Sequence, residues 1–380
     1  MRGLFAKLVI AASTCLTCNA SADTTKKPQI QMLPRLREQA QIVDAWTEER
    51  KALIPGILRK YGVDAWLISQ REYAEDTVFW ALKDYEQFSA RRRTTQLILA
   101  NATGDSPLSY TWVDNTPLVW SELTAVLVAQ QPRNIALNTH AELAFSGGLH
   151  AGERDAIEAA LGDWADRFVL EPMIAVEVVA TMVESRLGWY RKLMETAWAI
   201  IEEAFSTSNI IPGKTTTLDL EWCDTEDDIP ASVLEGLRKG NRLQDITRDN
   251  MKIGMTGNEI LKKIRHQMDQ ENIQGKIYCH ATGEMGHSAG TVIGMTNLQD
   301  SVPFLGDLPL LKNTYYSIEL FAQHYIPEKN KTVNFPLEED VYWSEETQTW
   351  EWVFGRQSKY LVVHPPMNGN TEQMQLEFEL

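Results

Sequence analysis

The sequence predicts an α+β protein with two folded parts, on three observations. Its 380 residues are 44% hydrophobic and 23% charged, a balance typical of a globular chain long enough for two domains. In the first half, short apolar strands alternate with amphipathic helices, which is typical of an α/β domain. In the second half, helices come first and strands follow. We therefore expect an α/β domain at residues 23–175, a second domain at residues 176–366 and a tail at residues 367–380.

The first 22 residues have the pattern of a cleavable secretory signal. Arg2 and Lys7 form a positive region, and Leu8 to Leu16 form an apolar core too short to span a bilayer. Ala20-Ser21-Ala22 has the small-x-small pattern of a cleavage site. The sequence therefore predicts a signal peptide at residues 1–22 and a secreted or periplasmic mature protein.

Charge and composition exclude several classes of partner. Lys and Arg number 36 against 52 Asp and Glu, so the net charge is -16, which disfavours nucleic acid and anionic membranes. Two cysteines follow the signal, Cys223 and Cys279, and the sequence leaves open a disulfide or a buried free thiol at Cys279. Homodimer formation is left open as well.

Each expected element of the first domain follows from periodicity. Ile42, Trp46 and Leu53 recur at helical spacing, while apolar runs near Gly62 and Gly104 are short enough for strands. The expected elements are a helix at 36–61, strands at 64–69, 95–100 and 109–113, a helix at 118–130 and a strand at 134–137. Glu171-Pro172 begins a less regular stretch, which we interpret as the domain boundary.

The second domain is predicted to place helices before strands. Helices are expected at 187–205 and 231–251, and a third begins at the capping box Thr256-Gly257-Asn258-Glu259. The expected strands are 276–280, 314–321 and 337–343. The first of these helices carries an apolar face made of Trp189, Leu193, Ala197, Ile200, Ile201 and Ala204.

Three side chains in or after these strands are candidates for chemistry. His287 lies between Gly286 and Gly290, and glycines permit sharp bends and close approach to a ligand. Glu319 lies in an apolar strand, where a carboxylate is costly unless a positive charge neutralises it. Glu338 is the third, in the segment Phe335 to Trp343.

Alternation along this last segment separates Glu338 from its neighbour Glu339. The period of two puts Phe335, Leu337, Glu339 and Val341 on one face of the strand, and Glu338 on the other, with Asn334, Pro336, Asp340 and Tyr342. One imidazole and two carboxylates on neighbouring strands favour Mn²⁺ or Zn²⁺ over copper. Such an ion acidifies water and polarises a carbonyl, so the sequence predicts hydrolytic chemistry.

The order of these motifs resembles the Xaa-Pro aminopeptidase, prolidase and creatinase family. The matching segments are Gly286-His287-Ser288-Ala289-Gly290, Ser317-Ile318-Glu319 and Leu337-Glu338-Glu339. The N-terminal stretch Tyr61 to Ile68, followed by Arg71-Glu72-Tyr73, is similar to the family's N-terminal domain. The resemblance implies a pita-bread catalytic domain, with His287, Glu319 and Glu338 as metal ligands and Glu339 as the less expected third ligand. It also implies that His280 binds substrate.

The activity implied by this resemblance is removal of the residue ahead of proline from short peptides. Mn²⁺ is the expected ion, with Zn²⁺ and Co²⁺ as alternatives. Glu319 or a neighbouring carboxylate would move protons as general base and acid, and His280 would orient the substrate.

The sequence departs from the family pattern around residues 218–230. Two further aspartate ligands are expected on paired strands, but Leu218 to Trp222 runs directly into the acidic segment Cys223 to Asp228. We interpret this as a shortened catalytic domain that holds one ion or none, with Asp224 as the one candidate replacement ligand. A catalytically inactive homologue acting as a binding protein is therefore the alternative function. Metal-free, creatinase-like C–N hydrolysis, with His280 or His287 as the acid-base catalyst, is a third.

Overall fold

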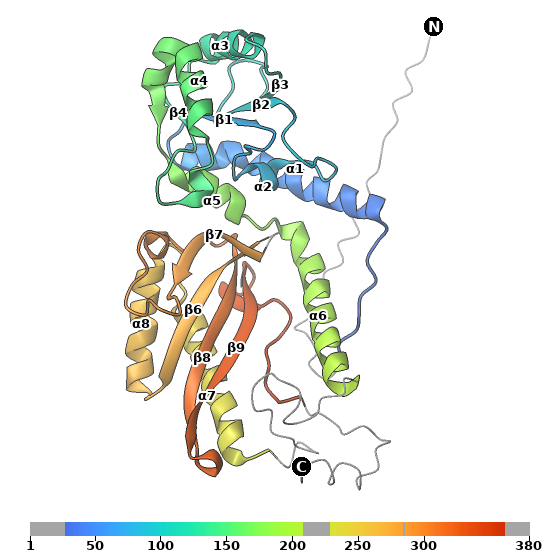
Figure 1. Ribbon diagram of the computed structural model, residues 1–380, viewed down its shortest axis with the longest axis vertical. Helices are drawn as coiled ribbons and strands as arrows, with labels where there is room; N and C mark the ends of the chain where they lie inside the picture. Colours follow the sequence, from blue (N-terminus) through green and yellow to red (C-terminus); the bar gives the residue numbers. More distant parts are fainter. Residues whose placement is uncertain (1–26, 208–228, 284–285, 362–380) are drawn as a thin grey trace, which may run out of the picture.

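The computed structural model describes residues 27–207, 229–283 and 286–361 (Figure 1). The expected signal peptide, Cys223, Asp224 and the tail at 367–380 lie outside these residues. No helix in the described ranges is long and apolar enough to cross a membrane. The chain forms two five-stranded sheets with helices, so the predicted α+β class is confirmed.

The first half is a mixed sheet covered on both faces. Its strands lie in the order β3-β2-β1-β4-β5, with β1 antiparallel to β2 and parallel to β4. The strands are β1 (Ala65–Arg71), β2 (Arg93–Leu99), β3 (Ser109–Val113), β4 (Ile135–Ala136) and β5 (Phe168–Val169). The helices are α1 (Leu36–Lys60), α2 (Phe79–Leu82), α3 (Leu118–Gln130), α4 (Ala151–Leu161) and α5 (Pro172–Ala180).

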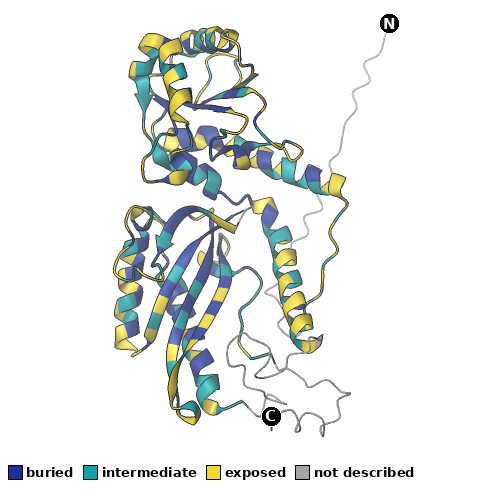
Figure 2. Cartoon of the chain, in the orientation of Figure 1, coloured by how far each residue is buried: buried dark blue, intermediate teal, exposed yellow. Residues whose placement is uncertain are grey.

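Strand β1 forms the centre of this first half because both of its faces are buried. Ala65 and Leu67 pack with residues of α3 and α4, while Trp66 and Ile68 pack with residues of α1 and α5. Six of the seven residues of β1 are buried, and the central strands of this sheet are largely buried in Figure 2. A strand buried on both faces is apolar throughout rather than alternating, as the sequence indicated for this segment.

The segment after Glu171 is a helix, which corrects the expectation of an irregular stretch. Glu171 caps α5 by accepting a hydrogen bond from the Met173 backbone N–H at 3.1 Å, and Pro172 occupies the first helical position. One side of α5 packs on the first sheet, and Val176 and Ala180 pack with Ala289 of the second. This helix therefore bridges the two halves.

The second half is an antiparallel sheet in the order β10-β9-β8-β6-β7. Its strands are β6 (Gln274–Gly283), β7 (Gly286–Ile293), β8 (Tyr315–Ile326), β9 (Lys331–Ser344) and β10 (Thr349–Trp352). Its helices are α6 (Leu187–Thr207), α7 (Ala231–Asn250) and α8 (Gly257–Gln270). The predicted capping box is present at the start of α8.

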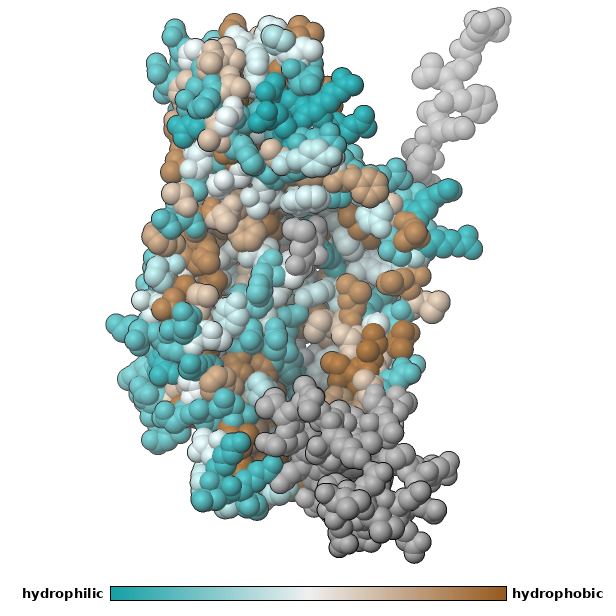
Figure 3. Space-filling model, viewed as in Figure 1, coloured by the Kyte–Doolittle hydropathy of each residue, from teal (hydrophilic) through white to brown (hydrophobic). Residues whose placement is uncertain are grey.

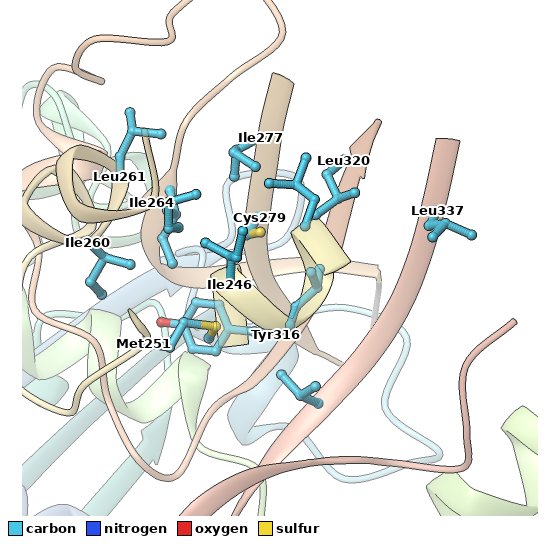
Figure 4. Packing of buried hydrophobic residues seen from close by; sticks show 14 of the residues in the cluster. Ile246, Met251, Ile260, Leu261, Ile264, Ile277, Cys279, Tyr316, Leu320 and Leu337 are labelled. Carbon is cyan, nitrogen blue, oxygen red and sulfur yellow. The ribbon is translucent and has the colours of Figure 1, made fainter. Parts of the chain in front are cut away.

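One face of this sheet is apolar and is covered by α7 and α8. Figure 4 shows Ile260 and Ile264 of α8 and Ile246 of α7 packed against Ile277 and Cys279 of β6. Cys279 is fully buried there with a free thiol. The other face of the sheet is polar and is described below.

Helix α7 lies close to strand β9 because it presents glycines there. A Cβ atom at Gly236 would lie 2.2 Å from the Phe335 ring, and one at Gly240 would lie 2.9 Å from the Leu337 side chain. Both contacts are shorter than packing allows, so α7 needs these two glycines to lie on the sheet.

Helix α6 lies on the polar side of the sheet, and its apolar face is incompletely covered. Leu193, Ile200 and Ile201 are 50%, 53% and 44% exposed, although they belong to the predicted apolar face. Figure 3 shows apolar side chains gathered along this helix.

The buried Asp76 predicts a pH dependence of stability in the first half. Burial raises the pKa of Asp76 to about 6, although its carboxylate accepts bonds from the Val78 backbone and the Asn138 side chain. A raised carboxyl pKa means that the folded state holds the proton more tightly than the unfolded chain does. The stabilisation is therefore complete below about pH 4 and is lost as the pH rises to about 6.

We compare the free energy of unfolding of the wild-type protein with that of Asp76→Asn. Relative to the variant, the wild type is expected to lose about 3 kcal/mol between about pH 4 and pH 7. Urea unfolding of both proteins at the two pH values measures this difference. A difference between wild type and variant that stays constant with pH would contradict the prediction.

Candidate metal centre

The strand register brings the candidate residues into two adjacent rows on the polar face. Tyr278 of β6 lies opposite Glu319 of β8, which lies opposite Glu338 of β9. His280 lies opposite Ser317 in the next row. Because side chains alternate along strands, residues two positions apart share a face, and both rows point to the same side.

Among the described residues, His280, Glu319 and Glu338 form a group that could hold a metal ion. Each offers one ligand atom, and these atoms all lie within 4.8 Å of one another. His280 Nε2 lies 3.8 Å from Glu319 Oε2. Ligand atoms about 2.1 Å from one ion are roughly 3–4 Å apart, so this spacing is close to that of a bound divalent cation.

A backbone hydrogen bond fixes the imidazole of His280 in the state that a metal requires. His280 Nδ1 lies 3.1 Å from the Ala281 carbonyl oxygen, which can only accept, so Nδ1 carries the proton. The lone pair is then on Nε2, the nitrogen that faces Glu319. Burial lowers the pKa of His280, which further favours the neutral ring.

The two carboxylates of Glu319 and Glu338 repel each other, and a bound cation would remove this repulsion. Burial raises the pKa of Glu319, and the negative charge of Glu338 raises it further. Ser317 Oγ donates to Glu338 Oε1 at 3.2 Å, which orients that carboxylate. A divalent ion would neutralise the repulsion between the two acids, so this donor set fits one divalent cation.

His287, the imidazole expected among the ligands, lies beside this group rather than within it. Its ring centroid is 4.2 Å from that of His280, and its side chain is exposed. The pairing of β6 with β7 is irregular between His280 and Thr282, so His287 lies opposite Thr282. The structure thus brings Glu319 and Glu338 together with His280, the expected substrate-binding residue, and places His287 beside them.

The glycines around His287 have a structural role. Gly286 and Gly290 have φ values of 88° and 139°, a backbone region that other residues rarely adopt. They shape the strand at the irregular pairing with β6. Met285, which precedes them, lies outside the described residues.

Glu339 lies on the opposite face of β9, as the alternation predicted. It is 4% exposed, accepts a hydrogen bond from the Gln357 backbone N–H at 2.7 Å and is also bonded by the Gln244 side chain. Burial raises the pKa of Glu339. Its role is to hold α7 and residue 357 against the sheet, away from the metal group.

The sequence reasoning did not identify a second pair of groups in the row of His280. Asp340 accepts a hydrogen bond of 2.5 Å from Tyr190 Oη on α6, and burial raises the pKa of Asp340. Alternation placed Asp340 on the face of Glu338, but nothing local indicated Tyr190. This bond connects the start of α6 to the polar face.

Comparison with known proteins gives structural neighbours but no family assignment. No family model matches the chain, and no curated protein matches it. The X-Pro aminopeptidase of Thermotoga maritima is 14% identical with a TM-score of 0.47, over 80% of this chain and 99% of that one. The Xaa-Pro dipeptidase of Bacillus anthracis is 11% identical with a TM-score of 0.45, over 83% and 99% of the two chains.

The structural neighbours also include a subunit of the FACT complex. The N-terminal domain of the FACT complex subunit SPT16 from chickpea is 9% identical with a TM-score of 0.46, over 85% of this chain and 99% of that one. At such identities and TM-scores these neighbours identify neither the family nor the activity of this chain.

Proposed function

We propose that this chain is a metal-dependent hydrolase that cleaves amide bonds in short peptides. The observation that carries the proposal is the convergence of His280, Glu319 and Glu338 within 4.8 Å on one sheet face. The motif resemblance supports the finer assignment, cleavage after the residue that precedes proline. Mn²⁺ is the proposed ion, with Zn²⁺ and Co²⁺ as alternatives, and one ion is proposed rather than two.

Each residue of the group has a distinct proposed role. His280 Nε2, one Glu319 oxygen and one Glu338 oxygen would hold the ion, which when bound supplies Lewis acidity toward an amide carbonyl and water. Glu319 or a neighbouring carboxylate would move protons as general base and acid. The exposed His287 is the imidazole left free to contact the substrate.

The proposal is tested by metal content and turnover together. Purified protein is incubated with Mn²⁺ and an Ala-Pro peptide, bound metal is measured by elemental analysis, and released alanine is measured by chromatography. We expect about one ion per chain and cleavage that a chelator abolishes. Absence of both stoichiometric metal and cleavage would overturn the proposal.

A binding protein on the same fold is the second candidate. The observation that favours it is in the sequence, where the segment 218–230 leaves no room for the paired strands that carry two further acidic ligands in the resembling family. A metal-free protein that binds Ala-Pro peptides without cleaving them would support this alternative.

A further inference from the structure

A cavity lies between helix α6 and the polar face of the sheet, directly beside the metal group. Its volume is about 550 Å³, within the range of small-molecule sites. Glu319 and Glu338 form part of its wall on the sheet side. The same two carboxylates therefore belong to the metal group and to this cavity.

The opposite wall of the cavity is apolar and comes from α6. Five residues of that helix line it, namely Met194, Ala197, Trp198, Ile201 and Phe205. They recur at intervals of three or four residues, so they form one stripe of the helix. Ile201 is 44% exposed and lines this cavity.

The cavity is chemically two-sided. The sheet side offers two carboxylates, although apolar residues such as Phe321 also line it. The nearby cation Lys276 already donates to the Thr296 carbonyl at 2.7 Å. The α6 side offers aliphatic and aromatic surface, on which an apolar group loses contact with water. A small ligand that fills this space needs a polar end at Glu319 and Glu338 and a bulky apolar end at α6.

We infer that the substrate carries a large apolar side chain, branched aliphatic or aromatic, next to the amide bond that is cleaved. This inference rests on the proposed function, because it places the amide at the metal group and the side chain against Trp198 and Phe205. It adds a specificity that the metal residues themselves do not provide. Peptides with glycine or alanine at this position would leave the α6 wall uncovered.

The inference is tested first without metal, by equilibrium binding of three amino-acid amides to the wild-type chain. Phenylalaninamide and leucinamide are expected to bind at least about 10-fold more tightly than glycinamide, since one methylene in an apolar pocket is worth roughly 10-fold or more. Isothermal titration measures the affinities. Equal affinity for the three amides would overturn the inference.

Two variants of the same helix locate the binding site. Ala197 lines the cavity, so Ala197→Trp should fill it and remove the preference for phenylalaninamide. Ala204→Trp is the matched control, because Ala204 is exposed on the same helix and is not among the residues that line the cavity. Ile201→Ser is a milder change that should also weaken phenylalaninamide binding. Unchanged binding in Ala197→Trp and Ile201→Ser would overturn the inference.

Mn²⁺ titration of the same proteins separates this inference from the proposed function. If Mn²⁺ binds and peptides are cleaved without preference for an apolar residue, the inference fails and the function stands. If the amides are discriminated but Mn²⁺ does not bind, the proposed function fails, and with it the substrate part of the inference. We expect Mn²⁺ affinity to be the same in Ala204→Trp and in wild type.

Discussion

Replacing His280 by alanine is expected to weaken Mn²⁺ binding by more than about 100-fold, since even the outer-shell partner of a metal ligand is worth roughly 10- to 100-fold. The variant removes Nε2, which lies 3.8 Å from Glu319 Oε2. The Ala281 carbonyl accepts the Nδ1 proton, so the lone pair is on Nε2. His287→Ala is the matched control, because it removes a neighbouring imidazole that lies outside the group. Competition titration with a metal-sensitive dye measures both affinities.

His280 is 7% exposed, so its replacement could also affect folding. His280→Gln keeps most of the side-chain volume, and thermal unfolding of the metal-free variants checks that the sheet is intact. We expect His280→Gln to lose Mn²⁺ affinity while its unfolding temperature stays near that of wild type. The reverse pattern, with affinity lost in His287→Ala and kept in His280→Gln, would assign the ligand to His287, as the family resemblance implied.

The sequence predicted most elements of the fold because their signals are local. The helices α3 and α7 and the strand β3 agree with the expected bounds within a residue or two, and α8 begins at the predicted capping box. The alternation along β9 also predicted its faces, since Phe335, Leu337, Glu339 and Val341 are all buried. Helical and strand periods depend only on neighbouring residues, so a single sequence contains them.

The assignment of the imidazoles could not be predicted in the same way. Whether His280 or His287 faces the carboxylates depends on the pairing of β6 with β7 and on its irregularity, which involve residues distant in sequence. The position of α6 over the polar face is also a long-range property. Helix α5, in contrast, was missed although its signals, a Glu171 cap and Pro172 at the first helical position, are local.

Substitutions of the adjacent acids Glu338 and Glu339 are expected to have different effects, one on metal affinity and the other on the free energy of unfolding. Glu338→Ala should weaken Mn²⁺ binding by more than about 100-fold, because it removes one of three ligands. Its effect on unfolding should be small, since Glu338 is exposed and its removal also relieves the repulsion that raises the pKa of Glu319. Mn²⁺ titration and urea unfolding of the metal-free protein measure the two properties.

Glu339→Ala should give the opposite result. It leaves the fully buried Gln244 side chain without its acceptor, at roughly 1–3 kcal/mol, and removes the acceptor of the half-buried Gln357 backbone N–H, so a loss of at least about 1 kcal/mol is expected. The folded variant should still bind Mn²⁺, because Glu339 points away from His280 and Glu319. If Glu339→Ala lost the metal while Glu338→Ala kept it, β9 would have to be shifted by one residue against β8. Such a shift would bring Leu337 to the polar face and expose part of the core. The wild-type protein would then have a low free energy of unfolding.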